Sequence, residues 1–165
     1  PEFGTKRENE ERRDGGLGVI FDPETQLYAV GNQPSGLLAL FAGGVDPKDD
    51  IQEGVLREVR EESGLYDFLY VEKLGAGYAH YRNSLRNVNR FTKSTAFLIV
   101  LKSRSLQATK LEAHEQFTLA WATPEELLAN WNVRNENKDH DHSIYFLERA
   151  VSRVKELGHD KKATL

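Results

Sequence analysis

One segment, residues 43–65, constrains the fold of this chain more than any other. Residues 51–63 carry apolar side chains at helical spacing, between the pair Gly43-Gly44 and a single glycine, Gly64. A glycine directly after the last periodic residue is typical of a helix that ends in a left-handed conformation. We therefore predict a helix over residues 51–63 that stops at Gly64.

The start of this helix carries two candidate caps. Asp49 and Asp50 both precede the apolar pattern, and Asp50 has Glu53 three residues later, which is the spacing of a capping box. The sequence favours a capping role for this aspartate pair.

Apolar runs and turn signals on both sides of the helix predict strands, followed by two late helices. The predicted strands cover residues 15–22, 26–31, 37–42, 68–81 (with a bulge at Gly75 or Gly77), 95–102 and 117–122. The first late helix begins at Thr123-Pro124, and the second covers residues 143–157. Strands on either side of one helix, with more helices at the end, predict an α/β fold with a mixed central sheet.

We expect one domain over residues 15–157, because no linker composition divides that stretch. Pro1 to Thr5 resembles a cloning scar, and we expect residues 1–14 to form a flexible arm and residues 158–165 a loose tail. The chain has no Met, so an origin as part of a longer protein stays open.

Composition excludes several classes of function. The net charge of −4 argues against a general nucleic-acid binder, and the absence of Cys excludes disulfides, thiolate metal sites and a cysteine nucleophile. The longest apolar run, residues 96–101, is too short to cross a membrane. We expect a cytoplasmic protein.

Three glutamates gather on one face of the predicted helix. Glu58, Glu61 and Glu62 are spaced i, i+3 and i+4, within an arc of about 100°. Like charges at this spacing repel each other, and a hard cation such as Mg²⁺ or Mn²⁺ would relieve the repulsion. A solvated acidic face, with Arg57 and Arg60 as ion-pair partners, is the alternative; the glycine turns at both ends favour a ligand site.

The same segment resembles the Nudix box. The matching positions, separated by the spacings of that motif, are Gly43, Asp49, Arg57-Glu58-Val59, Glu61-Glu62 and Gly64-Leu65. Asp49 stands where the family pattern has Glu, and the glycine pair lies one place later than usual, so that either the loop is shorter by one residue or Gly44 occupies a free position.

The resemblance implies an α/β/α sandwich, and the order of strand, box helix, strands and late helix around these residues also fits the family. It also implies metal-dependent hydrolysis of a nucleoside diphosphate linked to another group, with Mg²⁺ or Mn²⁺ held by Glu58, Glu61 and Glu62. Arg57 would orient the carboxylates, and Asp49 and Gly43 would support the site from the loop before the helix.

A further glutamate from outside the box would complete such a site. Glu115 lies six residues before Trp121 in the loop that precedes a predicted strand, a spacing similar to one in the family. We expect Glu115, in preference to Glu112, to act with Glu58 and Glu62 in catalysis and as a metal ligand; an exposed loop acid is the alternative.

Residues 78–93 form a local basic cluster in an acidic chain, and we expect them to bind substrate. Aromatic and cationic side chains suit stacking on a base and binding of phosphates. The candidates are Tyr78, Tyr81, Arg82, Arg86 and Arg90. A solvated loop between two strands is the alternative. His140 and His142 lack a partner cluster, and we expect them in a polar lead-in that caps the last helix.

These inferences predict a Nudix-type pyrophosphohydrolase that acts on a small nucleotide, without a membrane, as a monomer or homodimer. Two alternatives remain: a domain that senses a nucleotide without turnover, and an accessory domain of a larger, RNA-related protein. RNA binding has no direct support in the sequence, and the identity of the nucleotide is left open.

Overall fold

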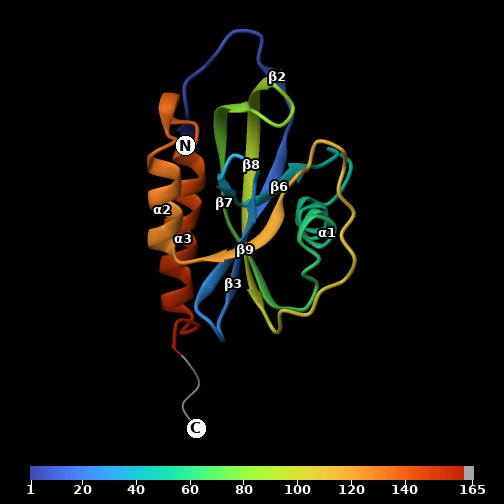
Figure 1. Ribbon diagram of the computed structural model, residues 1–165, viewed down its shortest axis with the longest axis vertical. Coiled ribbons are helices and arrows are strands. Elements are labelled where there is room, and N and C mark those ends of the chain that lie inside the picture. Colours follow the sequence, from blue (N-terminus) through green and yellow to red (C-terminus); the bar gives the residue numbers. More distant parts are fainter. Residues whose placement is uncertain (162–165) are drawn as a thin grey trace.

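The computed structural model describes residues 1–161, which form a nine-stranded mixed sheet between two layers of helices (Figure 1). The strands are β1 (Glu2–Phe3), β2 (Glu11–Arg12), β3 (Gly15–Asp22), β4 (Leu27–Asn32), β5 (Leu38–Ala39), β6 (Phe41–Gly44), β7 (Phe68–Asn83), β8 (Val88–Leu101) and β9 (Thr118–Ala122). Their order is β1-β7-β8-β3-β4-β5, with β2 on β8, β6 on β3 and β9 on β4.

Helix α1 (Ile51–Ser63) lies on one face of the sheet, and α2 (Pro124–Asn132) and α3 (Asp141–Glu156) lie on the other (Figure 1). A short 3-10 turn, η1 (Glu136–Lys138), joins the last two helices. The expected α/β/α sandwich is therefore confirmed.

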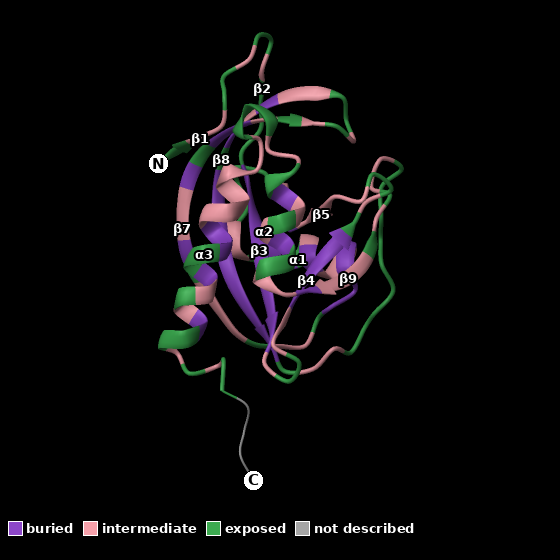
Figure 2. Ribbon diagram, turned by 60° about the vertical axis from the view of Figure 1, so that its left-hand side comes forward, coloured by how far each residue is buried: buried purple, intermediate pink, exposed green. Residues whose placement is uncertain are grey.

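Strand β3 explains why two cores form. It is buried along its whole length, between parallel β8 on one side and antiparallel β6 and β4 on the other (Figure 2). Successive side chains of a strand point to opposite faces. Leu17, Val19 and Phe21 therefore join the core under α2 and α3, whereas Ile20 joins the core under α1.

The ends of α1 follow the sequence signals. The Asp50 carboxylate accepts a hydrogen bond from the Glu53 N–H at 3.0 Å, so Asp50 is the N-cap. Asp49 lies in the preceding turn, where its N–H donates to the Asp46 carbonyl. Gly64 has φ +81° and donates its N–H to the Arg60 carbonyl, which confirms the predicted left-handed end.

Glycines in β3 bring α1 unusually close to the sheet. A Cβ on Gly16 would lie 2.5 Å from Val55 Cγ2, and one on Gly18 would lie 3.0 Å from Val59 Cγ2. The apolar stripe of α1 packs directly on these backbone positions, and this contact sets the height of the helix above the sheet.

The hairpin of β7 and β8 is longer than the sequence predicts. The two strands pair from Phe68 to Asn83 and back to Leu101, so only residues 84–87 form a turn. The predicted strand began at Thr95 because residues 88–94 are mostly polar, yet their backbone continues the ladder. The irregularity expected near Gly75 is present between Lys73 and Gly75.

Two other segments also differ from expectation. The predicted strand over 37–42 divides into β5 and β6, which pair with different neighbours, β4 and β3. Residues 1–14, expected as a flexible arm, contribute β1 and β2 to the sheet edge, where the Phe3 ring lies 5.0 Å from that of Tyr145.

Of the expected loose tail, residues 158–161 form a turn, and 162–165 lie outside the described residues. No helix within residues 1–161 has both the length and the apolar character that crossing a bilayer requires.

The buried carboxylate of Asp22 generates a pH-dependent prediction. Burial would raise the pKa of Asp22, but hydrogen bonds from Thr25, Arg104 and the Glu24 N–H outweigh burial and lower the pKa below 3.8. The ionised form therefore stabilises the fold at neutral pH, and this contribution is lost as the pH falls through the lowered pKa.

We expect Asp22→Asn to reduce the free energy of unfolding by about 1–3 kcal/mol at neutral pH. The difference from the wild type should shrink as the pH falls below 3.8 and through the lowered pKa of Asp22, because the native carboxyl group is then protonated as well. Urea denaturation across this range measures it, with Asp160→Asn at an exposed position as the control. A loss that is independent of pH would contradict the assignment.

Candidate active site

Three glutamates converge at the C-terminal half of α1. Glu58 and Glu62 lie one helical turn apart on α1, and Glu115 comes from the loop between β8 and β9. One carboxylate oxygen from each lies within 4.8 Å of the others. Glu62 is only 6% exposed, so its carboxylate has little contact with solvent.

The loop reaches this position because it is tied to the end of α1. The Gln107 N–H donates to the Gly64 carbonyl at 2.8 Å, and the Lys110 N–H donates to the Glu61 carbonyl at 2.7 Å. These bonds satisfy carbonyls at the helix end that otherwise lack partners. They also bring the following residues back across α1, as Figure 1 shows.

The site is strongly acidic. Burial raises the pKa of Glu62 far above its usual range, and the adjoining Glu115 carboxyl and the charges of Glu58 and Glu61 raise it further. Burial and the charges of Glu61 and Glu115 also raise the pKa of Glu58, against a smaller opposing effect of Arg57. The cluster therefore favours any bound proton or cation.

A glycine makes room for Glu58. A Cβ on Gly43 would lie 2.9 Å from both Cγ and Cδ of Glu58. Glu58 can approach β6 this closely only because position 43 has no side chain.

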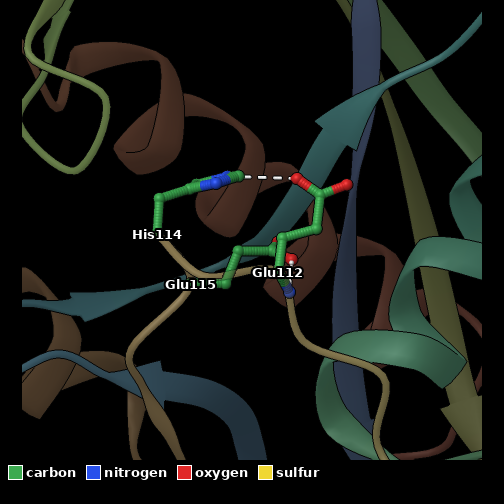
Figure 3. A group of neighbouring side chains, drawn as sticks. All are labelled: Glu112, His114 and Glu115. Carbon is green, nitrogen blue, oxygen red and sulfur yellow. Dashed lines mark hydrogen bonds and ion pairs between the residues drawn. The ribbon is translucent and has the colours of Figure 1, made fainter.

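The donor set fits a hard divalent cation. Carboxylate oxygens from Glu58, Glu62 and Glu115 are the ligand type that Mg²⁺ and Mn²⁺ prefer, and their mutual repulsion would fall on binding. A second group of side chains shares Glu115: Glu112 and His114 point toward each other with Glu112 Oε2 and His114 Nε2 3.5 Å apart (Figure 3).

A cleft of about 520 Å³ opens beside the cluster. Glu58, Glu62 and Glu115 line one part of it, and the remaining wall combines apolar, neutral polar and cationic side chains. The arginines in its wall are Arg13, Arg82, Arg86, Arg90 and Arg134. Arg86 reaches from the β7–β8 turn to Glu112 at 3.2 Å, so opposite charges meet across the cleft. A cleft with both signs of charge can hold metal ions and an anionic ligand together.

The NUDIX domain model matches residues 11–149. This chain belongs to the Nudix family. No curated protein matches its sequence. Family membership, together with the acidic cluster, is consistent with a Nudix-type enzyme.

Solved Nudix structures share the fold at low sequence identity. The Nudix domain of NrtR from Shewanella oneidensis, in complex with ADP-ribose, is 16% identical with a TM-score of 0.60, over 90% of both chains. The Ap4A hydrolase of C. elegans is 15% identical with a TM-score of 0.54, over 88% of this chain and 98% of the other. A Nudix hydrolase from Nitrosomonas europaea is 20% identical with a TM-score of 0.53, over 84% and 91%.

The Nudix box residues separate into two groups. Glu58 and Glu62 join Glu115 in the cluster, whereas the Glu61 carboxylate is not among the oxygens within 4.8 Å. Arg57 is exposed, and no ion pair within 4 Å involves it among residues 1–161. Asp49 is exposed in the turn before α1.

The predicted substrate residues lie mostly in the cleft. Tyr81, Arg82, Arg86 and Arg90 line it, from the end of the β7–β8 hairpin. Tyr78 does not line this cleft; its ring stacks on Phe91 with the centroids 5.8 Å apart.

The cleft also contains Arg13, Arg134, His140 and His142, none of which was predicted to line it. His140 and His142 are in no metal-ligating group among the described residues. His140 is the N-cap residue of α3, but its side chain makes no capping hydrogen bond; the side chain of Asn135 instead accepts from the His140 N–H and donates to Asp141. Arg13 sits in a charged run that resembled a solvated arm, so no sequence signal distinguished it.

The cost of ionising Glu62 in the folded protein can be measured through the thermal stability of a variant. Because the folded state raises the pKa of Glu62, its ionised form opposes folding, and the cost grows as the pH rises above the ordinary value of 4.5. With a chelator at about pH 7.5, we expect Glu62→Gln to raise the melting temperature by at least about 2 °C.

The control is Glu53→Gln, an exposed position on the same helix, which should give no increase. The gain at position 62 should shrink toward pH 4.5 and disappear below it, where the carboxyl group is protonated in both the folded and the unfolded state. A melting temperature that is unchanged or lowered at neutral pH would contradict this account of the cluster.

Proposed function

We propose that this protein is a divalent-metal-dependent hydrolase that cleaves the pyrophosphate linkage of a nucleoside diphosphate joined to another group. The observation that carries the proposal is the convergence of Glu58, Glu62 and Glu115 at one side of an arginine-lined cleft. A pyrophosphate is doubly anionic, so its cleavage needs cations at the reacting oxygens and positive charge along the rest of the ligand.

The three carboxylates would hold Mg²⁺ or Mn²⁺ at the edge of the cleft. When bound, such an ion neutralises the phosphate oxygens and lowers the pKa of water. The arginines at the end of the β7–β8 hairpin orient the anionic substrate by charge-assisted hydrogen bonds. Glu115, on the loop, would accept a proton from a water molecule in the cleft.

The relatives support a nucleotide as the substrate. The NrtR Nudix domain binds ADP-ribose, and the C. elegans protein is an Ap4A hydrolase. Both ligands contain nucleoside phosphates joined through anhydride linkages. A cleft of about 520 Å³ lies within the range of small-molecule sites and can enclose one nucleotide.

A nucleotide sensor without turnover is the second candidate, because the NrtR domain with which this chain shares its fold is described in complex with ADP-ribose. The two functions differ in one observable: a sensor binds its nucleotide in Mg²⁺ or Mn²⁺ and releases no product.

The decisive experiment measures product release from a panel of nucleotides. The panel contains nucleoside triphosphates, nucleotide sugars, dinucleoside polyphosphates, ADP-ribose and capped RNA, each with Mg²⁺ and with Mn²⁺. We expect turnover of at least one compound, and we expect Glu62→Gln to reduce kcat by at least about 100-fold, because a ligand to the reacting centre is lost.

Glu53→Gln is the matched control, and it should retain wild-type turnover. Glu61→Gln tests a separate point: a loss as large as that of Glu62→Gln would assign Glu61 to the metal, although its carboxylate lies outside the cluster. Full activity in Glu62→Gln would overturn the proposed hydrolase. If no compound of the panel gives product but the protein still binds a nucleotide, the result would support the sensor instead.

A further inference from the structure

The two glycines at the end of β6 face different side chains. Consecutive strand residues point to opposite faces. The Cβ direction of Gly43 leads to Glu58, on the α1 side, whereas that of Gly44 leads directly onto Nε and Cζ of Arg13. Gly44 therefore makes room for a guanidinium group, just as Gly43 makes room for a carboxylate.

Arg13 stands out among the arginines of the cleft. Each of the other four has a polar partner: Arg82 donates to Asn87 and Asn89, Arg86 to Glu112, Arg90 to Glu11 and Arg134 to the carbonyls of Asn130 and Ser35. Within residues 1–161, no hydrogen bond or ion pair involves the side chain of Arg13. Its backbone is held firmly, since its N–H donates to the Phe91 carbonyl and its carbonyl accepts from the Thr92 hydroxyl.

A second guanidinium lies nearby and is almost fully enclosed. Arg90 is 4% exposed, and its salt bridge is a single 3.3 Å contact to Glu11, whose side chain is 62% exposed. Burial raises the pKa of Tyr81, whereas the charges of Arg90 and Arg13 act in the opposite direction. Tyr81 is the direct cross-strand partner of Arg90, and the side chains of Tyr81, Arg90 and Arg13 all line the cleft.

The strand beneath continues this polar surface. Arg90, Thr92 and Ser94 alternate along β8 and therefore share one face, and all three line the cleft. They are among the few polar residues that are buried in this protein. Within residues 1–161, the exposed Arg13 beside this row and the buried Arg90 within it have one carboxylate partner between them, the mostly exposed Glu11 of Arg90, so positive charge is in excess here and an anion would balance it.

We propose that Arg13 and Arg90, with the Tyr81 hydroxyl, form a phosphate-binding subsite on the face of β6 opposite the acidic cluster. This inference deepens the proposed function, on which it rests for the identity of the ligand as a nucleotide. The subsite binds a phosphate group of the substrate, and Arg13 fixes the position of the linkage relative to Glu58, Glu62 and Glu115. A guanidinium suits the task because its fork of donors matches phosphate oxygens.

The test measures binding without turnover. Isothermal titration calorimetry in a chelator follows the binding of ADP, AMP, adenosine and inorganic pyrophosphate to the full chain. We expect the affinity of the wild type to rise with the number of phosphates on the nucleoside. Arg13→Gln should weaken the binding of ADP by about tenfold or more and leave the affinity for adenosine unchanged. Arg13→Lys keeps the charge but loses the fork, so its loss should be smaller.

Lys155→Gln is the charge-matched control, because it removes a positive charge from the exposed surface of α3 outside the cleft. It should bind ADP as the wild type does. Thermal melting checks that each variant is folded; the Arg13 side chain makes no polar contact within the described residues, so its loss should not unfold the protein.

Wild-type ADP affinity in folded Arg13→Gln would overturn the subsite, as would an equal loss in Lys155→Gln or for adenosine. Pyrophosphate separates the two sources of phosphate: if it binds as tightly as ADP and is equally weakened in the variant, the subsite recognises free phosphate anions. Hydrolysis assays decide the proposed function independently. If Arg13→Gln binds ADP and turns over substrate as the wild type does, the subsite is wrong and the hydrolase stands. If Arg13→Gln binds ADP more weakly but the wild type hydrolyses no compound, the subsite stands and the hydrolase is wrong.

Discussion

The close approach of α1 to the sheet is the constraint on which the rest of the structure depends. Gly16 and Gly18 let Val55 and Val59 pack directly onto β3, and Gly43 admits Glu58 beside β6. Because the apolar stripe and the acidic face belong to one rigid helix, packing of the stripe forces the carboxylates against the strand edge. The hydrophobic contact under α1 thus supplies the free energy that holds like charges together.

Local signals in the sequence predict this helix well. The features of the fold that these signals miss depend on partners far away in the chain. The capping aspartate, the final glycine and the apolar period of α1 are all encoded within residues 50–64. The polar residues at the start of β8 give no strand signal, yet the ladder with β7 and β3 carries the strand through them. Pairing is a property of two segments, so the composition of one of them cannot reveal it.

The same distinction applies to the site. Spacing on a helix placed Glu58, Glu61 and Glu62 on one face, but it could not decide which of them would meet a residue from elsewhere. That choice depends on the loop that carries Glu115, which is tied to the carbonyls of Glu61 and Gly64. Arg13 was missed for a related reason: its role follows from contact with Gly44, a residue thirty-one positions later in the chain.

Strand β6 separates two groups of opposite charge. On one side the buried glutamates disfavour their own ionisation, and on the other Arg13 lacks a polar partner among the described residues. A phosphorylated ligand that carries divalent cations could balance both, with its cations at the carboxylates and a phosphate at the arginines. The glycine pair, displaced by one place from the usual Nudix pattern, then has a physical role, since each glycine gives one of the two charges access to the strand.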